Sequence, residues 1–294
     1  MRAFRRNILV LSVGIAVAIA PSSVAADIGA VEGEVAMPVA TNVARPVTVY
    51  NSVFSFRSTA TSGPATSVVM FGSPSDVPMM CDFNGDGTRS IAIVRSAGGS
   101  LIWFERLSNV AGPVDRTFYF GAATDTPVCG DWDGDGDDTP GILRNVNGAR
   151  SWFQSNEADG TGALTVFYFG AASDTPTFGD WDGNGTDTPG ITRASGYPLL
   201  WAYRNSNTNG PAEGHFYFGI NTDKPVVGDW DNDGADSPGI VRTEGAQLRW
   251  WTRNTIVNGA ATGSFLFGTP GSRAMIWKGS DVVLAPVAVS ARRE

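Results

Sequence analysis

An acidic string of eight residues recurs at a fixed interval in this chain, and no other feature restricts the fold as strongly. It reads Asp-Trp-Asp-Gly-Asp-Gly-Asp-Asp at residues 131–138, and related strings begin at Asp180 and Asp229. A looser copy, Asp-Phe-Asn-Gly-Asp-Gly, begins at Asp82, so the four copies start 49 residues apart. A repeat of this length is typical of proteins built from similar units that stack in a row or close into a ring.

Other residues keep the same 49-residue step and divide each unit into four short strands. One stretch precedes the acidic string, one follows it, one surrounds a tryptophan, and one ends in an aromatic residue followed by glycine. Clusters of Gly, Pro, Asn and Asp separate these stretches, as turns require. Four short strands per repeated unit predict the blades of a β-propeller. The recurring residues are Gly72, Gly121, Gly170, Gly219 and Gly268; Trp103, Trp152, Trp201 and Trp250; and Arg95, Arg144, Arg193 and Arg242.

The two ends of the chain indicate how many blades there are and how the ring closes. Residues 47–71 resemble the third and fourth strands of a unit, because Phe54 lies one period before the first recurring tryptophan. Met275–Lys278 and Asp281–Val289 would be the first and second strands of the same unit. Residues 47–291 number 245, which is five times 49. We therefore expect an all-β, five-bladed β-propeller of 49-residue four-stranded repeats, with the last blade closed by N- and C-terminal strands.

Residues 1–25 are predicted to be an export signal. Three arginines precede the apolar run Ile8–Ala20, and small residues end the segment at Ala25. An uncleaved membrane anchor is the alternative, but the run is shorter than the roughly 20 residues that a spanning helix needs. Residues 26–46 are predicted to be a linker and residues 47–294 the propeller domain, without a transmembrane segment in the mature chain. The protein is expected to be secreted or extracellular, or associated with the cell surface.

The two cysteines, Cys81 and Cys129, lie on the first strands of successive units. An exported protein permits a disulfide between them. Two buried free thiols are the alternative, because the geometry of a disulfide is strict and cysteine packs like a small apolar residue.

Alternating acidic side chains followed by glycine predict a cation site in each of the four loops. Positions 1, 3 and 5, counted from the first residue of each string, carry carboxylates or an amide, and glycine at position 6 permits a sharp turn. Such oxygen ligands suit a hard cation, and calcium is the usual ion. The loop is not an EF-hand, because position 12 is isoleucine and strands flank it. The candidate ligands are Asp82, Asn84, Asp86, Asp131, Asp133, Asp135, Asp180, Asp182, Asn184, Asp229, Asp231 and Asp233.

About four calcium sites are expected. The loop at Asp82 should bind most weakly, because its string has only two carboxylates besides Asn84, the fewest of the four loops. Tight turns, in which Asp-Gly pairs bond to their own backbone without an ion, are the alternative explanation.

The repeated motifs resemble the FG-GAP or VCBS repeats of integrin α-chain propellers and of many bacterial exported proteins. The residues that carry the resemblance are Phe120-Gly121, the string at 131–136 and Gly141-Ile142-Leu143-Arg144, with equivalents in the other units. The resemblance covers roughly residues 50–290 and implies a propeller with calcium between the first two strands of each blade.

One departure from that family leaves the last calcium ligand open. The family usually has Asp at position 9, where this chain has Ser or Thr. Asp stands instead at position 8 in three loops, which adds these candidate ligands: Asp138, Asp187 and Asp236.

The repeated aromatic residues and arginines each have two explanations. The tryptophans of the third strands would be sugar-stacking platforms if exposed, but large repeated aromatics usually fill the core between blades. Trp251 breaks the pattern and is a candidate for an exposed contact. The arginines would bind an anionic ligand or, as we favour, pair with carboxylates or carbonyls of neighbouring blades. Three tryptophans inside the loops are expected to point away from the ion into the core, namely Trp132, Trp181 and Trp230.

Composition gives little support for catalysis or nucleic-acid binding. The single histidine, His215, is expected on the surface of a strand, and no nucleophile motif surrounds any serine. The net charge of −8 gathers in loops that cations would neutralise, and so acidic a chain is unsuited to nucleic acid. The sequence therefore predicts a non-enzymatic, calcium-stabilised binding module whose partner is a protein or a surface polysaccharide. A lectin with several equivalent sugar sites is the alternative, and a polysaccharide-active enzyme is less favoured because the blades are nearly equivalent.

Overall fold

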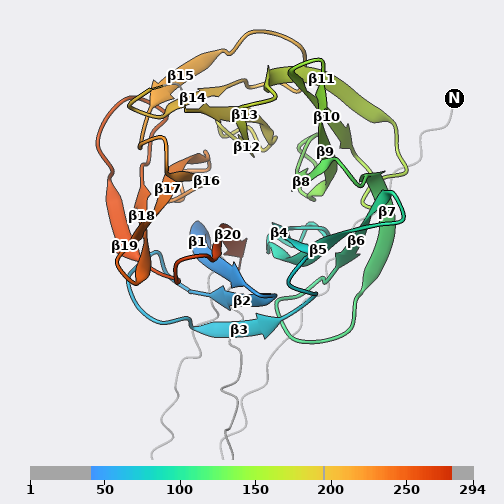
Figure 1. Cartoon of the computed structure of the whole chain (residues 1–294), viewed down its shortest axis with the longest axis horizontal. Helices are drawn as coiled ribbons and strands as arrows, with labels where there is room; N and C mark the ends of the chain where they lie inside the picture. The colour runs from blue at the N-terminus through green and yellow to red at the C-terminus, as the bar shows by residue number, and fades with distance from the viewer. Residues whose placement is uncertain (1–40, 195, 280–294) are drawn as a thin grey trace, which may run out of the picture. The chain divides into compact units, whose positions relative to one another are not determined.

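A computed structural model describes residues 41–194 and 196–279 of the chain. Five four-stranded antiparallel sheets are arranged in a ring (Figure 1). The predicted all-β, five-bladed propeller is therefore confirmed. Within the described ranges, no helix is long and apolar enough to cross a membrane. The predicted export signal at 1–25 lies outside the described residues.

Each blade has its first strand nearest the centre of the ring and its fourth strand at the rim (Figure 1). Blade 1 contains β4 (Val77–Cys81), β5 (Ser90–Ala97), β6 (Ser100–Glu105) and β7 (Arg116–Ala122). Blade 2 contains β8 (Thr126–Gly130), β9 (Thr139–Val146), β10 (Ala149–Ser155) and β11 (Leu164–Ala171). Blade 3 contains β12 (Thr175–Gly179), β13 (Thr188–Arg193), β14 (Leu200–Tyr203) and β15 (Gly214–Tyr217). Blade 4 contains β16 (Lys224–Gly228), β17 (Ser237–Glu244), β18 (Gln247–Thr252) and β19 (Gly263–Leu266).

Blade 5 combines the two ends of the chain, as predicted, but it divides the strands differently. Its order is β20 (Arg273–Gly279), β1 (Thr41–Tyr50), β2 (Val53–Phe56) and β3 (Ser67–Met70).

The expectation that Asp281–Val289 forms the second strand of this blade is wrong, because β1 pairs with β20 in that place. Asp281–Val289 itself lies outside the described residues, and residues 41–46, predicted to be linker, belong to β1. The backbone amide of Ala44 donates to the carbonyl oxygen of Asp229 at 2.5 Å, and in the other blades the residue directly before the second strand makes the corresponding bond. One C-terminal and three N-terminal strands therefore close the ring.

The recurring tryptophans form the centre of each blade core. Trp103, Trp152, Trp201 and Trp250 are 0–1% exposed. Each indole Nε1 donates, at 2.9–3.0 Å, to the carbonyl oxygen of a phenylalanine on or directly after the fourth strand, and each ring stacks on a second phenylalanine. Burial of so large a side chain with its one polar atom bonded is strongly stabilising. The core assignment is confirmed, and these side chains cannot serve as sugar platforms.

Candidate metal centres and the charged faces of the ring

The four acidic loops join the first and second strands of blades 1 to 4, so all lie at the same end of the inner strands. Neighbouring loops contact one another. At Gly134, which has φ of +80°, a Cβ would lie only 2.8 Å from Thr186 Oγ1 of the next loop. Glycine at position 4 therefore permits both the left-handed backbone and the close approach. The result is a continuous arc of acidic loops around one end of the ring.

The aspartate at position 1 organises the backbone of each loop. Asp131 Oδ1 accepts from the amide of Gly134 at 2.7 Å, and its Oδ2 accepts from the amide of Gly136 at 3.0 Å. The tryptophan at position 2 turns the other way, as predicted. Trp132 is buried, and its Nε1 donates to the carbonyl oxygen of Thr139 at 3.0 Å. The carboxylates of the loop thus face outward, and the indole packs beneath the loop against the core.

Two of the loops gather three carboxylates. One oxygen from each of Asp131, Asp133 and Asp135 lies within 4.8 Å of the others. The same holds for a second triad, made of Asp229, Asp231 and Asp233. In the other two loops an asparagine replaces one acid, Asn84 in blade 1 and Asn184 in blade 3. In blades 2 and 4 the structure therefore brings together the predicted ligands at positions 1, 3 and 5 as two full triads of negative charge.

The electrostatics of the triads suit a cation. Burial raises the pKa of Asp131, bonds from its own loop amides oppose the rise, and the charges of Asp138 and Asp135 add to it. The loop in blade 2 holds a further acid at position 7, Asp137, which shares a hydrogen bond with Asp135. That bond, with burial and neighbouring carboxylates, raises the pKa of Asp137 to about 6. Oxygen donors that repel one another in this way fit a hard divalent cation, which would relieve the repulsion.

The position 8 aspartates do not join the triads. Asp138 is buried, and its Oδ2 accepts from the backbone amide of Asp82 in the preceding blade at 2.7 Å. Its own amide donates to the carbonyl oxygen of Asp82, also at 2.7 Å. Asp187 and Asp236 make the same two bonds to the blades before them. These three carboxylates therefore join neighbouring blades.

Position 9 has a structural role as well. The hydroxyl of Thr139 donates to the carbonyl oxygen of Ser155 at 2.7 Å, and the corresponding hydroxyls of Ser90, Thr188 and Ser237 bond in the same way. Hydrogen bonds to other parts of the framework thus engage the side chains at positions 8 and 9. The carboxylates that converge within one loop come from positions 1, 3 and 5.

Blade 1 has an arginine where blades 2 to 4 have the position 8 aspartate. Arg89 is buried, with Nε 3.7 Å from Asp138 Oδ2 and Nη2 3.8 Å from Asp187 Oδ2. Burial raises the pKa of Asp187 to about 7, Arg89 opposes the rise, and Asp138 and Asp236 add to it. The cluster was not anticipated from the sequence, although the 49-residue step from Arg89 to Asp138 was the available signal.

Arginine–aspartate pairs mark the opposite end of the blades. Arg144 on β9 donates twice to Asp125, which lies in the connection before β8, at 2.7–2.8 Å. Equivalent two-bond pairs, at 2.5–2.8 Å, join Arg95 to Asp76, Arg193 to Asp174 and Arg242 to Asp223. The predicted pairing of these arginines with carboxylates is confirmed, but each carboxylate lies in the connection that leads into the arginine's own blade and not, as expected, in a neighbouring blade. The aspartates were not foreseen, and their constant distance of 19 residues before each arginine was the signal that could have found them.

Cys81 and Cys129 form a disulfide with a Cα–Cα distance of 6.2 Å. It joins β4 of blade 1 to β8 of blade 2, so the bridged alternative is the one that the structure contains. The covalent bond adds to the backbone contacts through which Asp138 holds the same two blades together.

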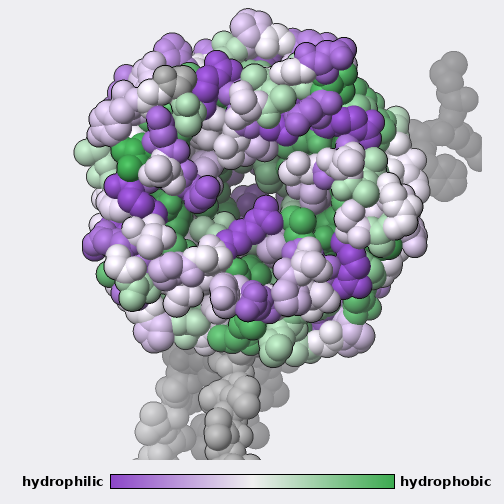
Figure 2. Space-filling model, in the orientation of Figure 1, coloured by the Kyte–Doolittle hydropathy of each residue, from purple (hydrophilic) through white to green (hydrophobic). Residues whose placement is uncertain are grey.

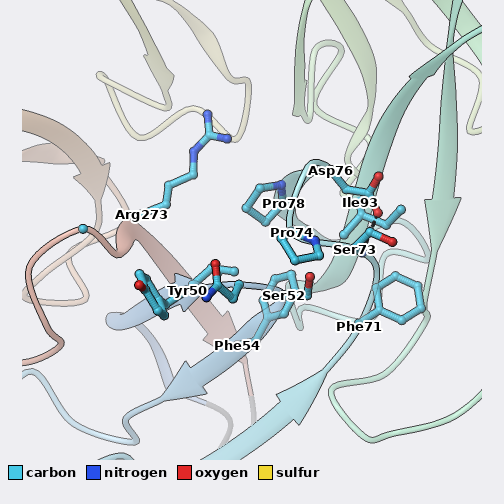
Figure 3. A pocket seen from close by; sticks show the side chains of 13 residues that line it. Tyr50, Ser52, Phe54, Phe71, Ser73, Pro74, Asp76, Pro78, Ile93 and Arg273 are labelled. Carbon is cyan, nitrogen blue, oxygen red and sulfur yellow. Dashed lines mark hydrogen bonds between the residues drawn. The ribbon is translucent and has the colours of Figure 1, made fainter.

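Two clefts lie where blades meet, at the end of the molecule that carries the arginine–aspartate pairs. One, of about 210 Å³, lies between blades 5 and 1 (Figure 3). The other, of about 300 Å³, lies between blades 3 and 4 and is lined by Tyr197, Arg242 and Trp251. Trp251 is half-buried beneath the guanidinium of Arg242, 4.8 Å from the ring centre, so it is partly available as a contact. His215 is exposed on the rim strand β15, as expected.

No family model, curated protein or solved structure matches the chain. The loops, the paired charges and the two clefts are therefore the observations from which a function can be argued.

Proposed function

We propose that this protein is an exported, calcium-stabilised binding module without catalytic activity, directed at a protein or a surface polysaccharide. The observation that carries the proposal is the pair of carboxylate triads held at one end of the ring. Calcium would be held by Asp131, Asp133 and Asp135 in blade 2 and by the corresponding triad of blade 4, with backbone carbonyls completing the ligands. The ion would neutralise repulsion among the acids and cross-link each hairpin.

The asparagine-containing loops of blades 1 and 3 would bind calcium more weakly. Residues 1–25 have the composition of an export signal, and the disulfide suits a protein made for an oxidising compartment. Binding rather than catalysis is supported by the near-equivalence of the four complete blades, whose recurring polar residues serve the framework in each.

Calorimetric titration of the chelator-treated protein with calcium tests the metal part of the proposal. We expect two tight sites, and we expect magnesium to compete weakly because it demands a more rigid octahedron. A matched pair of variants assigns the sites. Asp133→Asn should remove one tight site, whereas Glu157→Gln, which removes an exposed acid outside the loops, should remove none. Two unchanged sites in Asp133→Asn would contradict the assignment.

A lectin is the second candidate, and the two clefts favour it. Sugars commonly bind where an aromatic face adjoins polar hydrogen-bonding groups. Tyr197 is 82% exposed at the cleft between blades 3 and 4, beside Trp251 and Arg242. A glycan array and a protein-binding screen, each with calcium and with chelator, separate the candidates. Retention of defined glycans but of no protein would favour the lectin.

A further inference from the structure

Asparagine followed directly by glycine is a chemically labile pair that recurs in this chain. Glycine has no side chain to shield its backbone nitrogen, so the side-chain amide of the preceding asparagine can react with that nitrogen. The asparagine side chain must first turn onto the nitrogen, so hydrogen bonds that hold either group slow the reaction. The structure can therefore distinguish reactive pairs from protected ones. The pairs begin at Asn84, Asn147, Asn184, Asn209 and Asn258.

Hydrogen bonds hold three of the five asparagine side chains. The Oδ1 atoms of Asn209 and Asn258 each accept, at 2.8 Å, from a backbone amide on the rim strand of the preceding blade. Asn184 Oδ1 accepts from an amide of its own loop at 2.8 Å. The nitrogen that would have to react with Asn184, that of Gly185, donates to Asp180 Oδ2, also at 2.8 Å. These three pairs are therefore protected in the folded protein.

The pair Asn84–Gly85, in the acidic loop of blade 1, lacks this protection. Both residues are exposed, and neither the Gly85 nitrogen nor Asn84 Oδ1 forms a hydrogen bond with any residue that the structure describes. The asparagine side chain makes one bond, from Nδ2 to Asp86 Oδ2 at 3.0 Å. In blade 2 the amide of Gly134, which corresponds to that of Gly85, donates to Asp131 Oδ1 at 2.7 Å. Blade 1 thus combines a labile pair with a free backbone nitrogen.

We propose that Asn84 is a site of spontaneous deamidation, and that the aspartate formed there completes a third carboxylate triad. The Gly85 nitrogen attacks Cγ of Asn84, the Cγ–Nδ2 bond breaks, and Nδ2 leaves as ammonia with the proton of the Gly85 amide. Water then opens the cyclic imide. Opening at Cγ leaves aspartate at position 84, and opening at the main-chain carbonyl leaves isoaspartate. The reaction consumes one water, releases one ammonia and needs no oxidant.

The new carboxylate would appear beside the other acids of the loop. The side chains at positions 3 and 5 already meet, because Asn84 Nδ2 bonds Asp86 Oδ2. Asp82 Oδ1 accepts from the amide of Asp86 at 3.1 Å, so the loop wraps around its position 1 carboxylate. Blade 2 has Asp133 at position 3 and forms a full triad. Because calcium affinity depends on the number of charged ligands, deamidation would turn the weakest loop into a tight one.

Asn147 provides an internal reference for the reaction. It lies in the turn between β9 and β10, it is exposed, and neither its side chain nor the Gly148 nitrogen bonds any described residue. Over the face of the ring that Figure 2 shows, hydrophilic residues are interspersed with hydrophobic ones instead of forming one patch. A charge gained in an exposed turn outside the acidic loops has no converging carboxylates. Deamidation of Asn147 should therefore leave calcium binding unchanged.

Peptide mapping by mass spectrometry tests the reaction in the folded, chelator-treated protein. In mildly alkaline buffer we expect deamidation at Asn84 and Asn147. The rate at Asn84 should exceed that at Asn184 by at least about tenfold, because two hydrogen bonds protect the latter pair. Asn209 and Asn258 should also react slowly. In denaturant all five sites should react, because the protecting bonds are lost. Asn84→Gln should not react at this position, since its longer side chain closes the ring less readily.

Calorimetric titration with calcium tests the effect of the product. Asn84→Asp should bind three ions tightly where the unmodified wild type binds two. Asn147→Asp adds the same charge outside the acidic loops and should bind two. This effect rests on the proposed calcium function, whereas the reaction itself does not.

No deamidation at Asn84 while Asn147 reacts, or equal rates at Asn84 and Asn184, would overturn the proposed reaction. Two tight sites in Asn84→Asp would overturn its proposed effect. The absence of calcium binding from the wild type and from every variant would refute the proposed function, and the mass-spectrometric result would still decide whether Asn84 deamidates.

Discussion

Calcium should raise the melting temperature of this protein by an amount set by its two carboxylate triads. A ligand present at one hundred times its dissociation constant, and bound only by the folded state, stabilises by about 2.7 kcal/mol per site. Two such sites give about 5 kcal/mol. For a domain of this size each kcal/mol shifts the melting temperature by roughly 2–4 °C, so the expected rise from chelator to saturating calcium is about 10–20 °C.

Position 3 is the informative place to perturb the triads. The position 1 carboxylates bond the loop amides, so replacing them would disrupt the turn with or without an ion. Asp133 and Asp231 are exposed, and asparagine at these positions keeps the size of the side chain while removing one charge. Each single variant should lose about half of the calcium-dependent rise, and the double variant nearly all of it.

Differential scanning calorimetry in calcium and in chelator measures these shifts. In chelator the variants should melt at or slightly above the wild type, because they relieve repulsion among the acids. Glu157→Gln serves as the charge control and should keep the full rise. The same melting temperature in calcium and in chelator would refute the reasoning, because the acids would then act only as turn residues. A double variant that keeps the whole calcium-dependent rise in melting temperature would refute it as well.

Three further predictions concern the framework. Glu105 is fully buried, and no described residue donates a hydrogen bond to either of its carboxylate oxygens. Burial raises its pKa from 4.5 to about 8 against the opposing charge of Arg116. Because the pKa is raised in the folded state, the free energy of unfolding falls as pH rises from about 4.5 to about 8. In Glu105→Gln this fall should be absent, so at pH 8 the variant should be more stable than the wild type by roughly 3–5 kcal/mol. Urea unfolding at pH 5 and pH 8 measures the difference. A gain that is independent of pH would contradict this. Reducing the disulfide, which closes a separation of 48 residues, should lower the free energy of unfolding by up to about 4 kcal/mol, and equal unfolding curves with and without reductant would count against a structural bridge. Trp152→Ala should lower that free energy by about 3–5 kcal/mol, because the indole is fully buried and bonded, and a loss below 1 kcal/mol in the same unfolding assay would show that the site is not packed as described.

In the acidic loops, contacts within one loop could be predicted from the sequence, whereas contacts between blades could not. Positions 1 to 6 interact mainly with their own loop, so the spacing of Asp131, Asp133 and Asp135 was enough to predict that their oxygens converge. The hydrogen bonds of the position 8 side chain were not foreseen, because its partner lies in another blade. Asp138 bonds the backbone of Asp82, 56 residues earlier, and no local rule describes that contact. Whether an ion binds the loops stays a prediction.

The 49-residue repeat by itself determined the blade, its four strands and the number of blades, because each unit must bury the same apolar positions to fold. The closing blade was decided only by tertiary structure. Residues 41–50 and 281–289 are both apolar and rich in β-branched residues, and local pattern cannot choose between two such segments. Strand pairing decides which segment becomes the second strand of the closing blade. Residues 41–50 pair with β20, and the amide of Ala44, near the start of β1, bonds Asp229 of blade 4.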